Sequence, residues 1–145
     1  MAALDAATTR KFVGQQEEIS PKVAASDIYY RGAILCFDAS GYAAVPSDAA
    51  AIFPAGVVSG QYEKGVRDYA YSVGASEYPR AVLYRGKVWL PLASAAQTDV
   101  GAYAYIADDN SLTLTAGLKT AVLVVLDVDV ASGLALVDLR AAFVA

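Results

Sequence analysis

The fold is decided by the stretch Tyr29-Tyr-Arg-Gly-Ala-Ile-Leu-Cys-Phe-Asp-Ala-Ser-Gly-Tyr-Ala-Ala-Val-Pro46. Residues 29–37 are rich in aromatic and aliphatic side chains, which favour a β-strand. The following residues, Asp38-Ala-Ser-Gly41, have the composition of a tight turn. Residues 42–45 resume as a strand, which ends at Pro46 because proline has no N–H group to donate to a neighbouring strand. The stretch therefore predicts an antiparallel hairpin.

The same pattern of short apolar runs and turns continues along the chain. We expect further strands at residues 55–62, 66–73, 81–84, 87–90, 103–107, 111–115, 119–130 and 134–139. Arg85-Gly86 has the composition of a two-residue turn that would join 81–84 and 87–90 in a hairpin. Short strands spaced about 8–12 residues apart are typical of small β-barrels and sandwiches. The sequence therefore predicts an all-β domain over residues 26–145.

Residues 1–25 differ from the rest of the chain. They mix polar and charged residues, contain Pro21, and place a few apolar side chains among charged ones without a regular period. We interpret this segment as an extended N-terminal arm that becomes ordered against another surface. A strand that closes the domain's own sheet is an equal alternative.

Composition excludes several classes of protein. The chain has 145 residues, enough for one domain, and its 57% hydrophobic and 18% charged residues exclude bulk disorder. A net charge of −4 without a basic cluster argues against nucleic-acid binding. The start Met1-Ala-Ala-Leu-Asp5 resembles no signal peptide, and no apolar run is long enough to span a membrane, so we expect a soluble protein made in a cytoplasm. The single cysteine, Cys36, lies in an apolar run that predicts a buried, inert thiol.

No catalytic or metal-binding set stands out. Histidine is absent, which removes the commonest general base and the commonest metal ligand. The acidic pairs Asp108/Asp109 and Asp127/Asp129 offer a hydrolase its two carboxylates, but both fall where turns and strand ends place solvated acids. The Asp-Asp-Asn run at residues 108–110 also lacks the spacing of a calcium loop. We therefore expect no enzyme activity, no cofactor and no metal, and a small hydrolase is the weakest alternative.

Aromatic and apolar surface favours an interaction protein. The chain contains ten tyrosines, of which Tyr69 and Tyr71 share one face of a predicted strand, and Trp89 lies in another. Such rings serve protein interfaces or sugar-stacking platforms, and they also fill ordinary cores. The mean hydropathy of +0.40 is high for a 15.1 kDa chain with few charges, because a small monomer cannot bury that much apolar area alone. We expect part of it to lie in contacts with other chains.

Several sequence segments together resemble those of a known family. These are the run at residues 29–46, Ala55-Gly-Val-Val58, Arg85-Gly-Lys-Val-Trp-Leu-Pro-Leu92, and the segment 99–109 leading into Ser111-Leu-Thr-Leu-Thr115. In this order, over residues 27–139, they resemble the capsid decoration (cement) proteins of tailed bacteriophages. The tail Arg140-Ala-Ala-Phe-Val-Ala145 has no role assigned by the resemblance.

The resemblance implies a β-barrel or β-tulip-like domain on the outer surface of a virion capsid, made in the bacterial host's cytoplasm. Its implied partners are the major capsid protein and other copies of itself, with a trimer favoured. Many copies would bridge capsid subunits and stabilise the expanded head. The arm would add a strand to a capsid sheet. Its predicted contact residues are Phe12, Val13 and Ile19 in pockets, with Arg10, Lys11, Glu17 and Glu18 setting the register.

Two other structural functions remain open. A carbohydrate- or host-surface-binding module on the same barrel would use Tyr69, Tyr71 and Trp89. A tail-tube or head-completion protein belongs to the same broad class of virion components.

Overall fold

The computed structural model describes residue 4 and residues 8–23, 28–50, 52–59, 70–72 and 81–144. The regular secondary structure of the described chain is almost entirely β, which confirms the predicted all-β class. Its one helical element is the single 3-10 turn η1 (Gln97–Asp99). Its strands are β1 (Phe12–Ile19), β2 (Ile28–Tyr30), β3 (Ile34–Phe37), β4 (Ala43–Ala44), β5 (Phe53–Val58), β6 (Ala70–Ser72), β7 (Leu83–Pro91), β8 (Tyr103–Ile106), β9 (Leu112–Thr113), β10 (Ala121–Val124), β11 (Asp127–Asp129), β12 (Leu134–Asp138) and β13 (Phe143–Val144).

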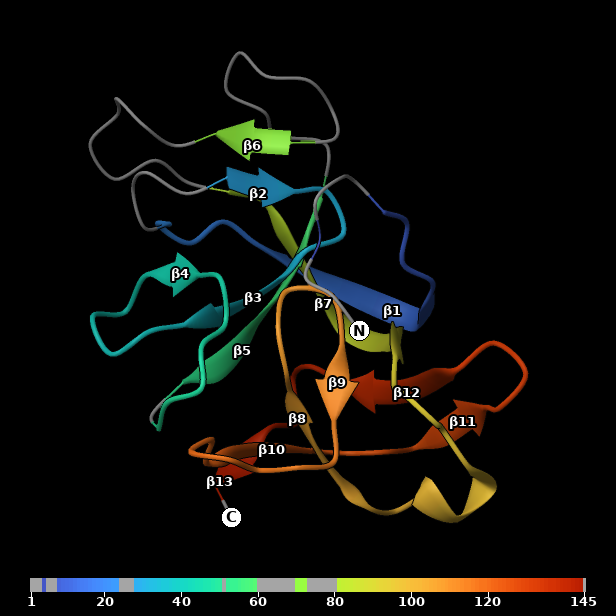
Figure 1. The fold of residues 1–145 in the computed structure, drawn as a ribbon. Coiled ribbons are helices and arrows are strands. Elements are labelled where there is room, and N and C mark those ends of the chain that lie inside the picture. Colours follow the sequence, from blue (N-terminus) through green and yellow to red (C-terminus); the bar gives the residue numbers. More distant parts are fainter. Residues whose placement is uncertain are drawn as a thin grey trace.

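The strands form three antiparallel sheets (Figure 1). The largest has the order β11-β12-β7-β5-β3-β4, with β1 added to β7. A second sheet has the order β13-β10-β8-β9, and a third consists of β2 and β6. An isolated parallel bridge between Leu92 and Leu112 links the first two sheets where β7 ends. The two larger sheets are therefore joined through the backbone at this point.

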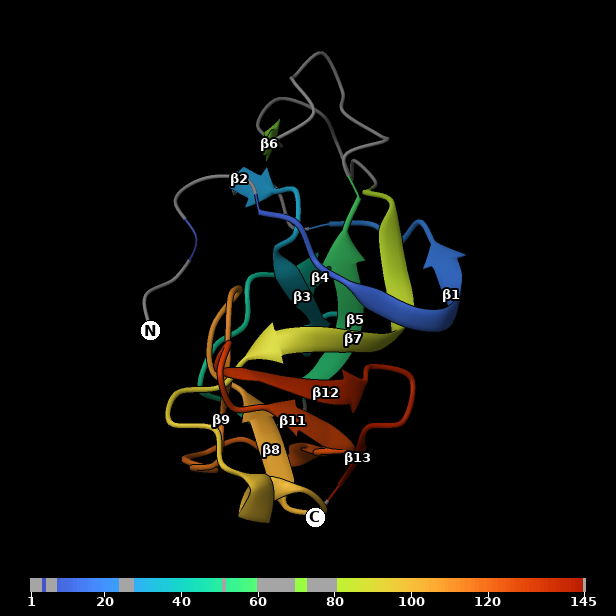
Figure 2. The ribbon, with the colours of Figure 1, turned by 90° about the vertical axis from the view of Figure 1, so that its right-hand side faces the viewer.

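Strand β7 connects most of the large sheet. It pairs with β1 over Leu83 to Val88, with β5 at Leu83 and Tyr84, and with β12 from Lys87 to Pro91. A strand residue can have only one partner strand on each edge, so β1 occupies one edge while β5 and β12 follow one another along the other. Figure 2 shows the sharp bend of β7 between these two partners.

The predicted hairpin turn at Arg85-Gly86 is wrong. Strand β7 runs through both residues and bends there instead of reversing. Gly86 adopts φ +145°, and a Cβ at this position would lie 3.0 Å from the carbonyl oxygen of Gln15 in β1. The glycine therefore serves the close approach of another strand, a role that uses the same residue type as a turn.

The buried residues form two clusters on opposite faces of the large sheet. Ile34, Cys36 and Val57 belong to a larger cluster that also contains residues of the four-stranded sheet, such as Leu123. Leu35 belongs to the second cluster, together with residues of β5 and β7. Because both faces of β3 are covered, its sequence is continuously apolar instead of alternating. Burial raises the pKa of the Cys36 thiol to about 12, which confirms the predicted buried cysteine.

The turn predicted at residues 38–41 is confirmed. The Asp38 carboxylate accepts hydrogen bonds from the backbone N–H groups of Ser40 (2.9 Å) and Tyr42 (3.0 Å), and β3 pairs with β4 beyond it. However, two of the predicted strands, residues 29–37 and 119–130, are each divided into two shorter strands. Residues 29–37 form β2 and β3, separated by a turn at Arg31 and Gly32.

Residues 119–130 form β10 and β11, which belong to different sheets. The division occurs because the backbone of Val125 bonds to Ala102 (3.0 Å), whereas that of Leu126 bonds to Leu136 (2.8 Å). Periodicity alone does not reveal where a continuous apolar run changes its partner strand.

Candidate functional site

The N-terminal strand β1 is an edge strand of the large sheet. Within the described part of the chain its one partner is β7, so its other edge is open. Its six central residues are exposed, and only Phe12 and Ile19 are half-buried. An exposed strand edge presents N–H and C=O groups that another chain can pair with.

A bulge interrupts β1 near its middle. Val13 pairs with Lys87 and Glu17 pairs with Arg85, so β1 advances by four residues between these pairs while β7 advances by two. Gly14 adopts φ +73° in this bulge. Bulges twist an edge strand and limit uncontrolled pairing with other chains. The open edge is therefore regular only in the two short parts that flank the bulge.

Arg10 fixes the start of β1 to the domain. Its Nε donates to the carbonyl of Gly32 (2.8 Å), and its Nη2 donates to the side-chain oxygen (2.9 Å) and the carbonyl (3.2 Å) of Asn110. Burial lowers the pKa of Arg10, while the nearby carboxylates of Asp109 and Asp108 act to raise it. Arginine stays charged under these conditions. A fixed cation therefore lies where the N-terminal segment crosses the domain.

Asp109 makes a second attachment for the N-terminal segment. Its carboxylate accepts a hydrogen bond from the backbone N–H of Leu4 (2.8 Å). Only 5% of Asp109 is exposed, and burial raises the pKa of this carboxyl, an effect opposed by the Leu4 N–H and the Arg10 charge. Asp109 is thus a binding group within the chain and not a solvated turn residue.

The apolar residues predicted to contact a capsid divide between two sides of β1. Phe12 packs edge-on against Tyr84 of β7, with ring centroids 6.3 Å apart, and Ile19 packs against the second core cluster. Val13 is 39% exposed. Two of these side chains therefore hold β1 on its own domain, and Val13 remains accessible to a partner.

The charged residues of the predicted contact line the exposed part of β1. Lys11 and Glu18 are exposed, and the Lys11 carbonyl accepts a hydrogen bond from the backbone N–H of Trp89 (3.0 Å). Glu17 lies 3.4 Å from Arg85 in an ion pair on the surface. Exposed pairs of this kind contribute little stability, so their charges remain available to a partner.

The predicted aromatic surface stays a prediction. Tyr69 and the side chain of Tyr71 lie outside the described residues. The backbone of Tyr71, in β6, pairs with Tyr29 of β2. Trp89 is half-buried in β7, opposite Leu136 of β12.

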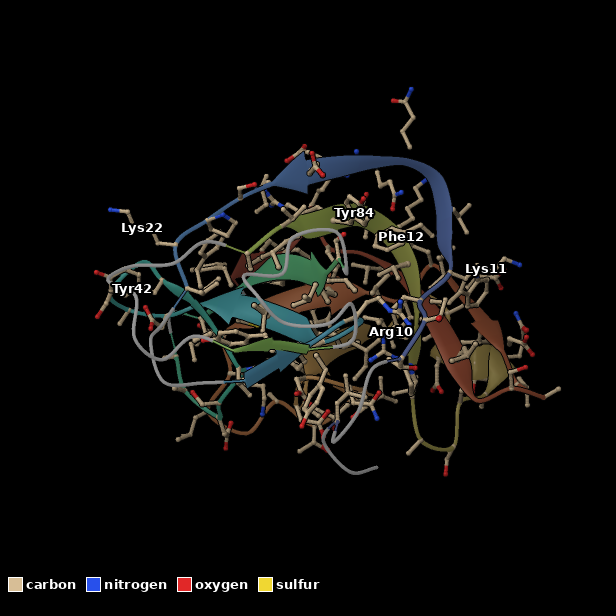
Figure 3. The ribbon with its side chains drawn as sticks, turned by 90° about the horizontal axis from the view of Figure 1, so that it is seen from above. Arg10, Lys11, Phe12, Lys22, Tyr42 and Tyr84 are labelled. Atoms are coloured by element: carbon tan, nitrogen blue, oxygen red, sulfur yellow. The ribbon has the colours of Figure 1, made fainter. Side chains whose placement is uncertain are left out.

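A groove that the sequence did not predict lies beneath the N-terminal segment. Its volume is about 510 Å³, and its walls include Arg10, Phe12, Arg31, Val58 and Tyr84. Figure 3 shows Arg10, Phe12 and Tyr84 inside the curve of this segment, whereas Lys11 points outwards. The walls come from segments that are far apart in the chain, so no local motif marks the groove.

The acidic pairs are engaged in local structure. Asp108 accepts hydrogen bonds from the backbone of Asn110 (2.8 Å) and from both the backbone (2.8 Å) and the hydroxyl (3.0 Å) of Ser111. Asp127 and Asp129 are exposed at the two ends of β11. Asp127 accepts a hydrogen bond from the backbone N–H of Val128 (2.8 Å), and Asp129 accepts one from that of Ser132 (3.2 Å) in the turn after the strand. Among the described residues, no three potential metal ligands gather at one place, and no helix has the length and apolar character to cross a membrane.

Comparison with known proteins identifies a structural neighbour. No protein-family model and no curated protein matches the chain. A solved structure described as the capsid of Myoviridae phage XM1 contains a similar chain. The fold is shared with a component of a phage capsid. The match covers 96% of this chain and 93% of the other, with a TM-score of 0.53 and 13% sequence identity, so the likeness extends over nearly the whole of both folds.

Proposed function

We propose that this protein is a structural component of a phage virion that binds the outer surface of the capsid. The match to a chain from a phage capsid carries the proposal, because it covers 96% of this chain and 93% of the other. The phrases of the sequence that resemble decoration proteins support the finer assignment. In this role the protein bridges subunits of the major capsid protein and stabilises the expanded head.

The role is mechanical instead of catalytic. Asp108, which a hydrolase would use, already holds the turn at residues 108–111 through several hydrogen bonds. Asp127 and Asp129 are exposed residues at the two ends of the short strand β11. Binding selectively to the expanded lattice would stabilise that lattice by mass action.

The open edge of β1 supports a specific mode of attachment. A strand of the capsid protein would add to β1, and main-chain hydrogen bonds would supply the affinity. Phe12 and Ile19 keep β1 in the large sheet, so the strand is already extended before binding. Val13, Lys11 and Glu18 are exposed and would contact the partner's side chains.

Self-association would strengthen this attachment. The outer face of the four-stranded sheet carries Tyr103, which is 52% exposed, and Phe143, which is 39% exposed. Their rings meet edge-on with centroids 5.5 Å apart. An exposed aromatic pair supports contacts between copies, and linked copies bind a lattice with greater avidity than single ones.

The experiment is a comparison of purified expanded heads with and without the added protein. Co-sedimentation measures decoration, and release of DNA on heating measures stability. We expect the protein to sediment with heads and to raise the temperature at which they rupture. Equal rupture temperatures with full decoration would refute the stabilising role, and failure to sediment would refute capsid binding itself.

A further inference from the structure

The groove beneath the N-terminal segment has the size of a ligand site. Its volume of about 510 Å³ lies within the range of about 300–1,000 Å³ that is usual for binding pockets. One wall is the segment that leads into β1, and the opposite wall is the end of β5 with Tyr84 of β7. The groove therefore extends from β1 across Tyr84 of β7 to the end of β5, on the side of β1 that pairs with β7.

The charge of the groove is opposite to that of the protein. Arg10 and Arg31 line it, and within the part of the chain that the structure describes no acidic residue does, although the chain carries a net charge of −4. Arg10 is also held in position, because its three hydrogen bonds bind Nε and Nη2 to Gly32 and Asn110. All three acceptors are neutral oxygens. Among the described residues no carboxylate lies within ion-pair distance of Arg10, and those of Asp109 and Asp108 act on its charge from farther away. A pre-positioned guanidinium of this kind suits a carboxylate.

The rest of the groove is partly apolar. Phe12 and Tyr84 meet edge-on in its wall, and Val57 and Val58 lie beneath with 3% and 4% of their surface exposed. A single inorganic anion would satisfy Arg10 but leave this apolar part uncovered. An occupant that carries both a carboxylate and an aliphatic or aromatic side chain matches both parts.

We propose that this groove binds an acidic peptide segment of a partner protein. The partner's carboxylate would pair with Arg10, and a neighbouring apolar side chain would pack on Phe12 and Tyr84. The inference rests on the proposed function only for the identity of that partner, the major capsid protein. The groove would then recognise the side chains of the segment, whereas the edge of β1 would bind any extended backbone.

A pair of peptides tests the charge requirement. The acetylated and amidated peptide Gly-Leu-Glu-Leu-Gly is titrated into the full-length, isotope-labelled protein, and Gly-Leu-Gln-Leu-Gly serves as the uncharged control. We expect the first peptide to shift the backbone amide signals of Arg10, Gly32 and Tyr84, and to do so less at high salt. Equal binding of the two peptides, or shifts confined to other parts of the protein, would overturn the proposal.

Substitution of Thr9 gives a test that does not disturb the Arg10 hydrogen bonds. Thr9 lines the groove and is exposed, so either charge is accommodated at its rim. We expect Thr9→Lys to tighten binding of the acidic peptide and Thr9→Glu to weaken it, each by about 2- to 5-fold. The same changes at Thr98, which is exposed in η1, are matched controls and should leave the affinity unchanged. Thr9 variants that bind as the Thr98 variants do would contradict the proposal.

The same variants separate this inference from the proposed function. If Thr9→Glu reduces decoration of expanded heads and Thr98→Glu does not, the groove contacts the capsid. If the unmodified protein decorates heads but neither peptide binds, the groove inference fails while the proposed function stands.

Discussion

Replacing Gly86 by alanine tests whether crowding between β1 and β7 shapes the sheet. Gly86 has φ +145°, and a Cβ there would lie 3.0 Å from the carbonyl oxygen of Gln15. Backbone strain at such a φ costs about 1–3 kcal/mol, and overpacking costs about 1–3 kcal/mol more. The reduced entropy of the unfolded chain returns about 0.4–1 kcal/mol. We therefore expect the free energy of unfolding to fall by about 3 kcal/mol, and Tm to fall by about 6–12 °C.

Thermal unfolding followed by circular dichroism measures this change. Gly41→Ala is the matched control, because Gly41 has φ +84° but no atom within 4 Å of the added Cβ. It should lose only the backbone contribution, about 1 kcal/mol or about 2–4 °C in Tm. Hydrogen exchange should also show that Gly86→Ala releases the amides of β1 before those of the core. A Gly86→Ala variant no less stable than Gly41→Ala would refute the proposed crowding.

Three further predictions concern the core and the buried ionisable groups. Leu123→Ala should lower the free energy of unfolding by about 2–5 kcal/mol, since Leu123 is 1% exposed. Leu118→Ala, at a position 67% exposed, should change it by less than about 0.5 kcal/mol. Urea unfolding measures the two free energies. Cys36 should resist a thiol reagent at pH 8 until the protein unfolds; because its folded pKa is raised from 9.0 to about 12, its contribution to stability is present below pH 9 and is lost as the pH rises towards 12. The folded pKa of Asp109 is also raised, so folding favours the neutral carboxyl and stability is lost as the pH rises. Asp109→Asn should therefore raise Tm at pH 7, and the difference from the unmodified protein should disappear in acid. A lower Tm of the variant at pH 7 would contradict this sign.

Local turn chemistry predicted part of this fold correctly. The turn at residues 38–41 depends on Asp38 and Gly41, whose interactions lie within the turn itself. The all-β class likewise follows from short-range composition. Gly86 was misassigned because its role depends on Gln15, which is distant in the chain.

The candidate site was only partly predictable for the same reason. The sequence identified residues 1–25 as distinct and left open whether they would close the domain's own sheet. In the structure β1 pairs with β7, and none of the other described strands covers its second edge. The hydrogen bonds of Arg10 to Gly32 and Asn110, and the groove they border, depend on contacts between segments up to 100 residues apart. No pattern in a single segment encodes such an arrangement.

The position of β7 determines how the domain would respond to tension. Strand β1 covers one edge of β7, while β5 and β12 share the other. A force applied along β1 would shear its hydrogen bonds together instead of breaking them one at a time, and β7 would divide the load between β5 and β12. A partner that pulls on this strand would therefore strain the whole large sheet at once, so resistance to rupture would depend on the entire domain and not on its first few residues.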